Sequence, residues 1–183
     1  MRPAQIVICL FISSCAASIH PSVAEALSAL RQTPSQPSHT PTFKDFDRKP
    51  ATLSEEEFEA LRGRVMTRCN VAPGTDPTKA PWYFHYELGL ELEKRGDAQR
   101  ALDALIEATN HRPAPRRNAR MYGMWFTDYR PYFEIEKMHF ALGNWQCSMD
   151  ALKVSTGTRE VTERDEEYID LQELESALAR QSN

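Results

Sequence analysis

The sequence lacks the patterns that mark most catalytic, cofactor and metal sites. It places no nucleophile beside a base, it has no glycine-rich phosphate loop, and it has no cysteine or histidine pair at a zinc-type spacing. His85, His111 and His139 each stand without a second ligand three or four residues away in such a pattern, so we interpret them as structural. The sequence therefore predicts a protein that is not an enzyme, needs no cofactor and binds no metal.

A strong charge of one sign is also missing. The formal net charge is −4, whereas nucleic-acid binding would require a basic patch on a domain of high isoelectric point. The charge is nevertheless uneven, because residues 112–130 hold five arginines and one aspartate, and residues 160–175 hold eight acids and one arginine. We predict no nucleic-acid partner, a basic middle and an acidic tail.

Long hydrophobic runs are scarce, and the clearest one lies near the N-terminus. Residues 6–12 are uniformly apolar, follow Arg2 and precede small residues, which is the layout of an export signal. Even extended to Ile19 the run has 14 residues, fewer than the roughly 20 that a membrane-spanning helix requires. We predict a signal peptide over residues 1–26 and an exported protein.

The end of this signal has two readings. Residues 12–15 resemble the lipobox of bacterial lipoproteins, which would place a lipid on Cys15 and tether the protein to a membrane. Cleavage after Ala26 would instead release the protein into the periplasm or the medium. Both alternatives stay open at the level of the sequence.

Proline is abundant only in the first part of the chain. Nine of the 12 prolines precede Trp82, and proline interrupts regular helices. Residues 27–53 are also rich in serine and threonine and have no apolar periodicity, so we predict a disordered linker there. The helical domain is then expected over residues 54–183.

Cysteine is rare, and only Cys69 and Cys147 follow the predicted signal. An oxidising compartment would favour a bridge between them. Helix spacing separates their expected positions by roughly 20 Å, however, against the ~6 Å that a disulfide tolerates. We expect two buried free thiols.

The first predicted helix begins after Ser54. Ser54 and Glu57 have the spacing of a capping box, in which each side chain bonds the backbone amide of the other residue. Apolar residues then recur at three- and four-residue steps, and Pro73 and Gly74 end the pattern. The stripe consists of Phe58, Leu61, Val65 and Cys69.

Residues 82–113 predict a helical hairpin, because two apolar stripes at helical spacing flank Gly96 and Asp97. Small residues fall where two helices would pack closely. The spacing of the segment resembles the 34-residue tetratricopeptide repeat (TPR), and we identify 82–115 as a first repeat. The residues that carry the resemblance are Trp82, Leu88, Gly89, Leu92, Gly96, Ala101, Leu105, Ala108 and Pro113; His85 departs from it.

A second, poorer copy of the repeat covers residues 129–160. Glu136 and Ser148 replace the small residues of the family pattern at their positions. Gly143 follows Gly96 by 47 residues, 13 more than adjacent repeats would give, so residues 116–128 are an insertion. The copy rests on Tyr132, Ile135, Leu142, Gly143, Asn144, Leu152 and Ser155.

Residues 162–181 predict a final amphipathic helix, with apolar residues at Tyr168, Leu171, Leu174 and Leu178. A terminal helix of this kind caps a solenoid, burying one face and exposing the other to solvent. The predicted fold is all-α: a short TPR-like helical-hairpin solenoid with flanking N- and C-terminal helices.

The insertion is the strongest candidate for a binding site, because arginine forks and aromatic faces suit carboxylates, phosphates and stacking. The alternative is internal use, with the arginines paired to Glu134, Glu136 or the acidic tail. The candidates are Arg116, Arg117, Arg120, Tyr122 and Trp125 in the insertion, with Tyr83, Tyr86, Arg130, Tyr132 and Lys137 on the first helices of the two repeats.

The resemblance to the tetratricopeptide type implies a non-catalytic protein–protein interaction module. Together with the export signal, it predicts an adaptor in the bacterial cell envelope that binds a protein or peptide partner. The alternative function is an accessory protein that binds an anionic small molecule or glycan through the insertion.

Overall fold

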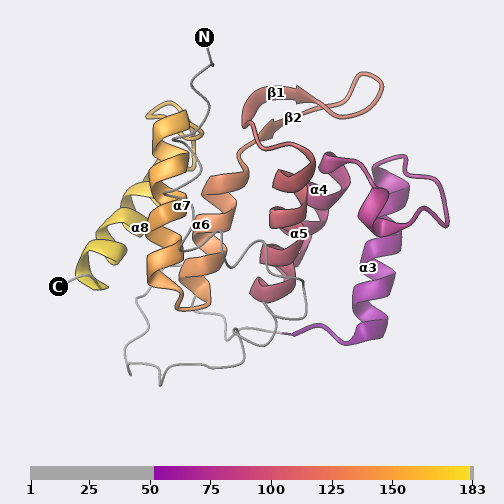
Figure 1. Cartoon of the computed structure of the whole chain (residues 1–183), viewed down its shortest axis with the longest axis horizontal. Coiled ribbons are helices and arrows are strands. Elements are labelled where there is room, and N and C mark those ends of the chain that lie inside the picture. Colours follow the sequence, from indigo (N-terminus) through magenta and orange to yellow (C-terminus); the bar gives the residue numbers. More distant parts are fainter. Residues whose placement is uncertain (1–51, 182–183) are drawn as a thin grey trace, which may run out of the picture. The chain divides into compact units, whose positions relative to one another are not determined.

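The computed structural model describes residues 52–181, which belong to one compact unit of the chain, Pro41–Asn183. The predicted signal peptide, the lipidation of Cys15 and nearly all of the predicted linker lie outside the described residues. Six helices and one β-hairpin follow one another along the described part (Figure 1). They are α3 (Glu55–Arg68), α4 (Trp82–Lys94), α5 (Ala98–His111), β1 (Arg116–Arg120), β2 (Phe126–Tyr129), α6 (Pro131–Ala141), α7 (Trp145–Thr158) and α8 (Tyr168–Gln181), with a 3₁₀ turn η1 (Pro77–Lys79) before α4.

The helices pack mainly against their neighbours in chain order. Helix α3 lies on α4, α4 on α5, α5 on α6, α6 on α7, and α7 on α8. The prediction of a mostly helical fold is confirmed. The two-stranded sheet was not predicted, so the expectation of an all-α domain is incomplete at the insertion.

Helix α3 begins at the predicted capping box. The backbone amide of Glu57 donates to Ser54 Oγ at 3.2 Å, and that of Ser54 donates to Glu57 Oε2 at 2.9 Å. Arg100 of α5 fixes the entry to this helix, because it donates to the Leu53 carbonyl at 2.9 Å and to Glu55 at 2.7 Å. The buried stripe then reaches Cys69, a free thiol. Cys147 is disulfide-bonded, and not to Cys69, so the expectation of two free thiols is wrong for Cys147.

Helices α4 and α5 approach each other most closely at Gly89. A Cβ atom at this position would lie 2.7 Å from Cγ of Leu105, well inside van der Waals contact. Gly96 supplies a positive φ of 79° at the turn, and Asp97 accepts the amide of Arg100 at 3.3 Å to start α5. The predicted hairpin over residues 82–113 is therefore formed by its small and turn-forming residues.

The contact between α6 and α7 accommodates a glutamate. Glu136 is fully buried, and neither oxygen of its carboxyl group has a hydrogen-bond partner in the described part of the chain. Burial raises its pKa to about 9, so this side chain is neutral at pH 7. Ser148 of α7 stabilises the contact, because its hydroxyl donates to the backbone carbonyl of Glu136 at 2.9 Å.

The insertion forms a β-hairpin in place of an irregular connector. Strands β1 and β2 are antiparallel, with a bulge between Arg116 and Ala119. Asn118 takes a positive φ of 49° in this bulge, and its amide donates to the Asp128 side chain at 2.8 Å. The tip is closed by the amide of Met121, which donates to the Trp125 carbonyl at 2.9 Å.

The last helix begins later than its predicted start at Thr162. Asp165 accepts the backbone amide of Thr162 at 2.7 Å and its hydroxyl at 2.9 Å, which holds a turn in place of the first helical residues. Helix α8 therefore starts at Tyr168. It buries Leu171, Leu174, Ala177 and Leu178. Within residues 52–181, none of the helices has both the length and the apolar character to cross a membrane.

We expect Gly89→Ala to lower the free energy of unfolding by about 1–3 kcal/mol relative to Gly63→Ala. Of the two methyl groups that these substitutions add, only the one at residue 89 would collide with another side chain, that of Leu105. Gly63 lies in α3 with open space around its Cα. Both substitutions gain the same helix propensity, so their difference isolates the contact with Leu105. Urea unfolding measures it, and equal changes in the two variants would contradict the close approach of α4 and α5.

Candidate functional site

The β-hairpin is attached to the helical body through the carboxylate of Asp165. Arg117 of β1 donates both terminal nitrogens to Asp165, one of them at 2.9 Å, and a third bond joins Arg117 to Thr162 at 3.1 Å. Arg130 reaches the same carboxylate at 3.3 Å. The Arg117 guanidinium holds the pKa of Asp165 well below its usual range. One charged group thus fixes the hairpin against the segment that precedes α8.

Arg130 lies at the centre of this network. Its side chain is almost fully buried and pairs with Asp128 at 3.1 Å and with Glu167 at 2.6 Å, in addition to Asp165. Tyr86 of α4 binds the backbone on both sides of this point: its hydroxyl accepts the Arg130 amide at 3.3 Å and donates to the Asp128 carbonyl at 3.1 Å. Tyr86 and Arg130, both predicted as exposed contacts, are therefore internal supports of the hairpin.

Aromatic rings fill the space beneath the hairpin. Tyr129 of β2 packs on Trp82, with 4.5 Å between the ring centroids, and donates to the Arg112 carbonyl at 2.7 Å. The ring of Tyr83 lies 5.7 Å from that of Tyr122, whose hydroxyl donates to the Arg68 carbonyl. Tyr83 and Tyr122 are half-buried in this stack, so the hairpin is held at its base and along one side.

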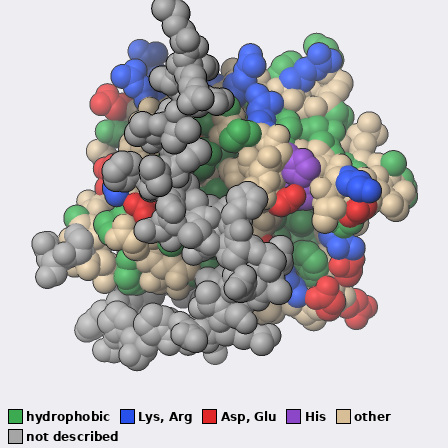
Figure 2. Space-filling view, in the orientation of Figure 1, with side chains coloured by type: hydrophobic (Ala, Val, Ile, Leu, Met, Phe, Trp, Pro, Cys, Tyr) green, Lys and Arg blue, Asp and Glu red, His purple; other side chains and the backbone are tan. Residues whose placement is uncertain are grey.

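The tip of the hairpin is apolar and exposed. Met124, Trp125 and Phe126 have exposed fractions of 83%, 66% and 50%. Arg116 and Arg120 are exposed on β1, and Arg120 donates to the Gly123 carbonyl at 2.8 Å. Basic and hydrophobic side chains meet at the upper edge of the space-filling view, where the hairpin lies in Figure 1 (Figure 2). We name Met124, Trp125, Phe126 and Arg120 the tip surface; Arg116 lies at the other end of β1, opposite Tyr129.

The candidate residues thus fall into three groups. Arg120 and Trp125 are on the tip surface, and Arg116 is exposed at the base of β1. Arg117 and Arg130 pair with the acidic segment before α8, as the internal alternative supposed, although their partners are Asp165 and Glu167 and not Glu134 or Glu136. Tyr132 and Lys137 are half-buried: Tyr132 donates to the Pro113 carbonyl, and Lys137 pairs with Glu93 and Glu134.

A cleft of about 680 Å³ lies between α4, α6 and the hairpin. Its charges satisfy one another, because Lys137 Nζ stands 2.5 Å from Glu93 and 2.7 Å from Glu134. Burial raises the pKa of Glu93 to about 7. A polar ligand would have to displace these ion pairs, so none of these three side chains is free to bind it.

A smaller pocket of about 280 Å³ is lined by four arginines. Arg116 and Arg159 have no carboxylate partner among the described residues, whereas Arg117 and Arg130 are paired within the network around Asp165. Glu160 lies at the same pocket and accepts the amide of Phe133 at 2.8 Å, at the start of α6. Arg159 was not predicted at this pocket; the end of α7 places it beside Arg116 and Arg117.

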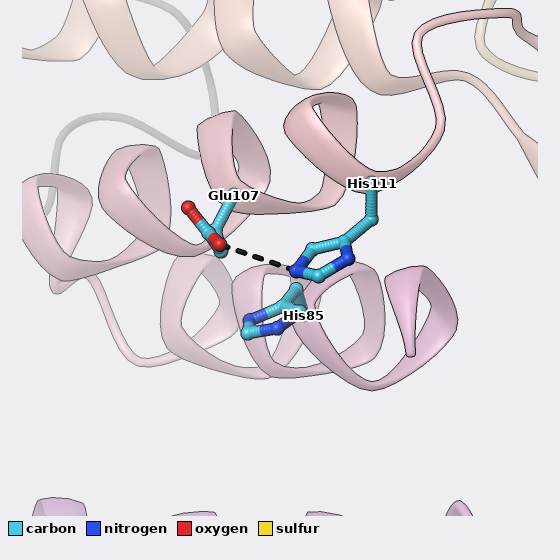
Figure 3. Close-up of side chains that lie close together, drawn as sticks. All are labelled: His85, Glu107 and His111. Carbon is cyan, nitrogen blue, oxygen red and sulfur yellow. Dashed lines mark ion pairs between the residues drawn. The ribbon is translucent and has the colours of Figure 1, made fainter. Parts of the chain in front are cut away.

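Two histidines and a glutamate meet between α4 and α5 (Figure 3). Nε2 of His111 lies 3.2 Å from Oε1 of Glu107, and the rings of His85 and His111 are stacked with 5.2 Å between centroids. One potential ligand atom of each of the three residues lies within 4.8 Å of the others. This cluster was not predicted from the sequence, although Glu107 precedes His111 by one helical turn. His139 does not join it.

No protein-family model, curated protein or solved structure matches this chain. The resemblance to the tetratricopeptide type therefore rests on the residues of the chain itself.

We expect Asp165→Asn to lower the free energy of unfolding at pH 7 by about 1–3 kcal/mol, because it weakens charged hydrogen bonds to Arg117 and Arg130. A carboxylate with a depressed folded pKa stabilises the protein above its unfolded pKa and loses that contribution as the pH falls. The difference from wild type should therefore shrink below a pH of about 4.

Urea unfolding at pH 7 and at pH 3 measures both effects. Glu166→Gln is the matched control, because Glu166 is exposed and next to Asp165 in sequence. Equal stability of Asp165→Asn and wild type at pH 7 would contradict the proposed attachment of the hairpin.

Proposed function

We propose that this protein is a non-catalytic adaptor that binds a protein partner through the tip surface. The observation that carries the proposal is the exposure of Met124, Trp125 and Phe126 together on a hairpin whose base is fixed by buried ion pairs. Exposed aromatic side chains beside arginines are typical of the residues that contribute most to protein–protein binding.

The rigidity of the hairpin supports this function. A flexible loop loses conformational entropy when it binds, whereas a preorganised one avoids much of that cost. Here Asp128 accepts the Asn118 amide across the hairpin, and Arg117 and Arg130 hold its two ends on Asp165. Trp125 is thereby presented at a defined place on the domain.

The chemistry of the tip surface indicates the kind of partner. Arg120 is exposed and, within residues 52–181, bonded only to the Gly123 carbonyl. Arg116, at the base of the same strand, is exposed and has no ion pair in that range. Guanidinium groups of this kind pair with carboxylates. We infer a partner surface with an apolar pocket for Trp125 and acidic residues at its rim.

We further propose that the helical body is a short TPR-like solenoid with flanking helices α3 and α8. Two successive helical hairpins, α4–α5 and α6–α7, each turn at a glycine of positive φ, Gly96 and Gly143. The close approach at Gly89 is the packing that the repeat pattern requires of its small residues.

The apolar segment at residues 6–12 supports an exported location for this adaptor, either in the periplasm, on a membrane through a lipid on Cys15, or outside the cell. A lipid at Cys15 would tether the domain near a bacterial membrane. The adaptor would then act in an assembly of the cell envelope.

The alternative function is the binding of an anionic small molecule or glycan. The pocket lined by Arg116, Arg117, Arg130 and Arg159 supports it, because two of these arginines have no carboxylate partner in the described part of the chain. Its volume of about 280 Å³ is suited to a small anion. The tip surface lies outside this pocket, which is at the base of the hairpin.

A photo-crosslinking residue at the position of Met124, in the producing cells, should capture a discrete protein partner. The same probe at the position of Ile169 should capture none, because Ile169 matches Trp125 in exposure, 65% against 66%, but lies on α8. Trp125→Ala should weaken the complex by about 2 kcal/mol or more, the loss typical of a central aromatic contact.

The purified complex gives this affinity directly, with Ile169→Ala as the control that should bind like wild type. Equal crosslinking from the two positions, or unchanged affinity of Trp125→Ala, would contradict binding through the tip surface. Binding of inorganic phosphate or a polyanion that Arg116→Ala abolishes, with no crosslinked partner, would favour the alternative function.

A further inference from the structure

His85 is a buried histidine with one unused ring nitrogen. Its exposed fraction is 5%, and its Nε2 atom has no hydrogen-bond partner among residues 52–181. The ring also interacts with the backbone carbonyls of Pro77 and Ala80, in and just after η1. A buried imidazole nitrogen without a partner can offer its lone pair to a metal ion.

Glu107 and His111 complete a set of three ligands on the facing helix. They lie one turn apart on α5, with 3.2 Å between Nε2 of His111 and Oε1 of Glu107. Figure 3 shows these two side chains on α5 and His85 on the neighbouring helix, with all three directed to one region. The three potential ligand atoms lie within 4.8 Å of one another.

We propose that His85, Glu107 and His111 form a site for a divalent transition-metal ion of the zinc type. Two imidazoles and one carboxylate are a ligand set that zinc accepts, with a fourth position left for water. Calcium and magnesium prefer sites built from oxygen atoms. The three residues thus select against these hard cations.

The site is accessible and needs only side-chain movement. His111 is exposed and ends α5, so an ion can enter from solvent and the imidazole can turn to meet it. His85 is held in place by the structure around it. The metal would replace the present contact between His111 and Glu107 with bonds to all three residues.

A bound metal would also stabilise the base of the β-hairpin. His111 directly precedes Arg112, whose guanidinium lies 4.8 Å from the centroid of the Trp82 ring and 5.9 Å from that of Tyr129 in β2. Metal bonds between α4 and the end of α5 would therefore fix the residues on which the hairpin rests. The metal site does not depend on the partner proposed for the tip surface.

The test uses the full-length protein, stripped of metal with a chelator and titrated with zinc chloride in a calorimeter. We expect one zinc ion per chain, a higher melting temperature with zinc, and a visible absorption spectrum of tetrahedral type when cobalt replaces zinc. Glu107→Gln and His111→Ala should each weaken zinc binding at least tenfold, because even outer-shell changes cost about 10- to 100-fold. His85→Ala should behave in the same way.

Controls separate this site from other ligands of the chain. Glu163→Gln matches Glu107→Gln at an exposed position, and the double variant His20→Ala, His39→Ala removes the histidines of the N-terminal region. Both should bind zinc like wild type. Circular dichroism verifies the fold of each variant; Glu107 and His111 are not buried, so their replacement leaves the core intact.

Absence of zinc binding to the wild-type protein would overturn the proposal. Wild-type affinity in both Glu107→Gln and His111→Ala would overturn it as well, because the ion would then be held elsewhere. Neither result would bear on binding of a protein at the tip surface.

Discussion

The carboxylate of Asp165 is the interaction on which the arrangement of this domain depends. It accepts hydrogen bonds from Arg117 at one end of the β-hairpin, from Arg130 at the other end, and from Thr162 in its own turn. The same residue therefore converts a connector between helices into an ordered hairpin and delays the start of α8. The exposed tip at Trp125 and the arginine-lined pocket both follow from this attachment. Part of the basic middle and part of the acidic tail are thus paired with each other inside the domain, through Arg117, Arg130 and Asp165.

The helices could be predicted from the sequence because their signals are local. The capping box at Ser54, the glycine at Gly96 and the apolar stripes of α4 and α5 each act within a few residues. The hairpin could not be predicted, because β1 and β2 have no alternating apolar pattern, and their order comes from side chains far along the chain. Arg117 and Asp165 are 48 residues apart in sequence. The later start of α8 has the same origin. The apolar residues of α8 lie on one face as predicted, but the turn held by Asp165 takes the place of the first predicted helical residues.

The candidate site was predictable in composition but not in geometry. The density of arginine and aromatic residues in 116–128 identified the segment, and Arg116, Arg120 and Trp125 are exposed there. Sequence alone could not distinguish these from Arg117, Arg130 and Tyr86, which bond inside the fold. Arg159 joins the small pocket, and His85 meets Glu107 and His111, only because the helices pack side by side. Glu136 shows the opposite case, in which a residue that breaks the repeat pattern is accommodated as a buried neutral acid.

The hairpin is a fixed part of the domain and holds Trp125 in place before any partner binds. Hydrogen exchange of the backbone amides in the wild-type protein tests this most directly. The amides of Asn118 and Met121, which donate to Asp128 and to the Trp125 carbonyl, should exchange far more slowly than the amide of Gly74 in an exposed turn. Exchange of Asn118 and Met121 at the rate of Gly74 would contradict the claim, because the hairpin would then be a mobile loop.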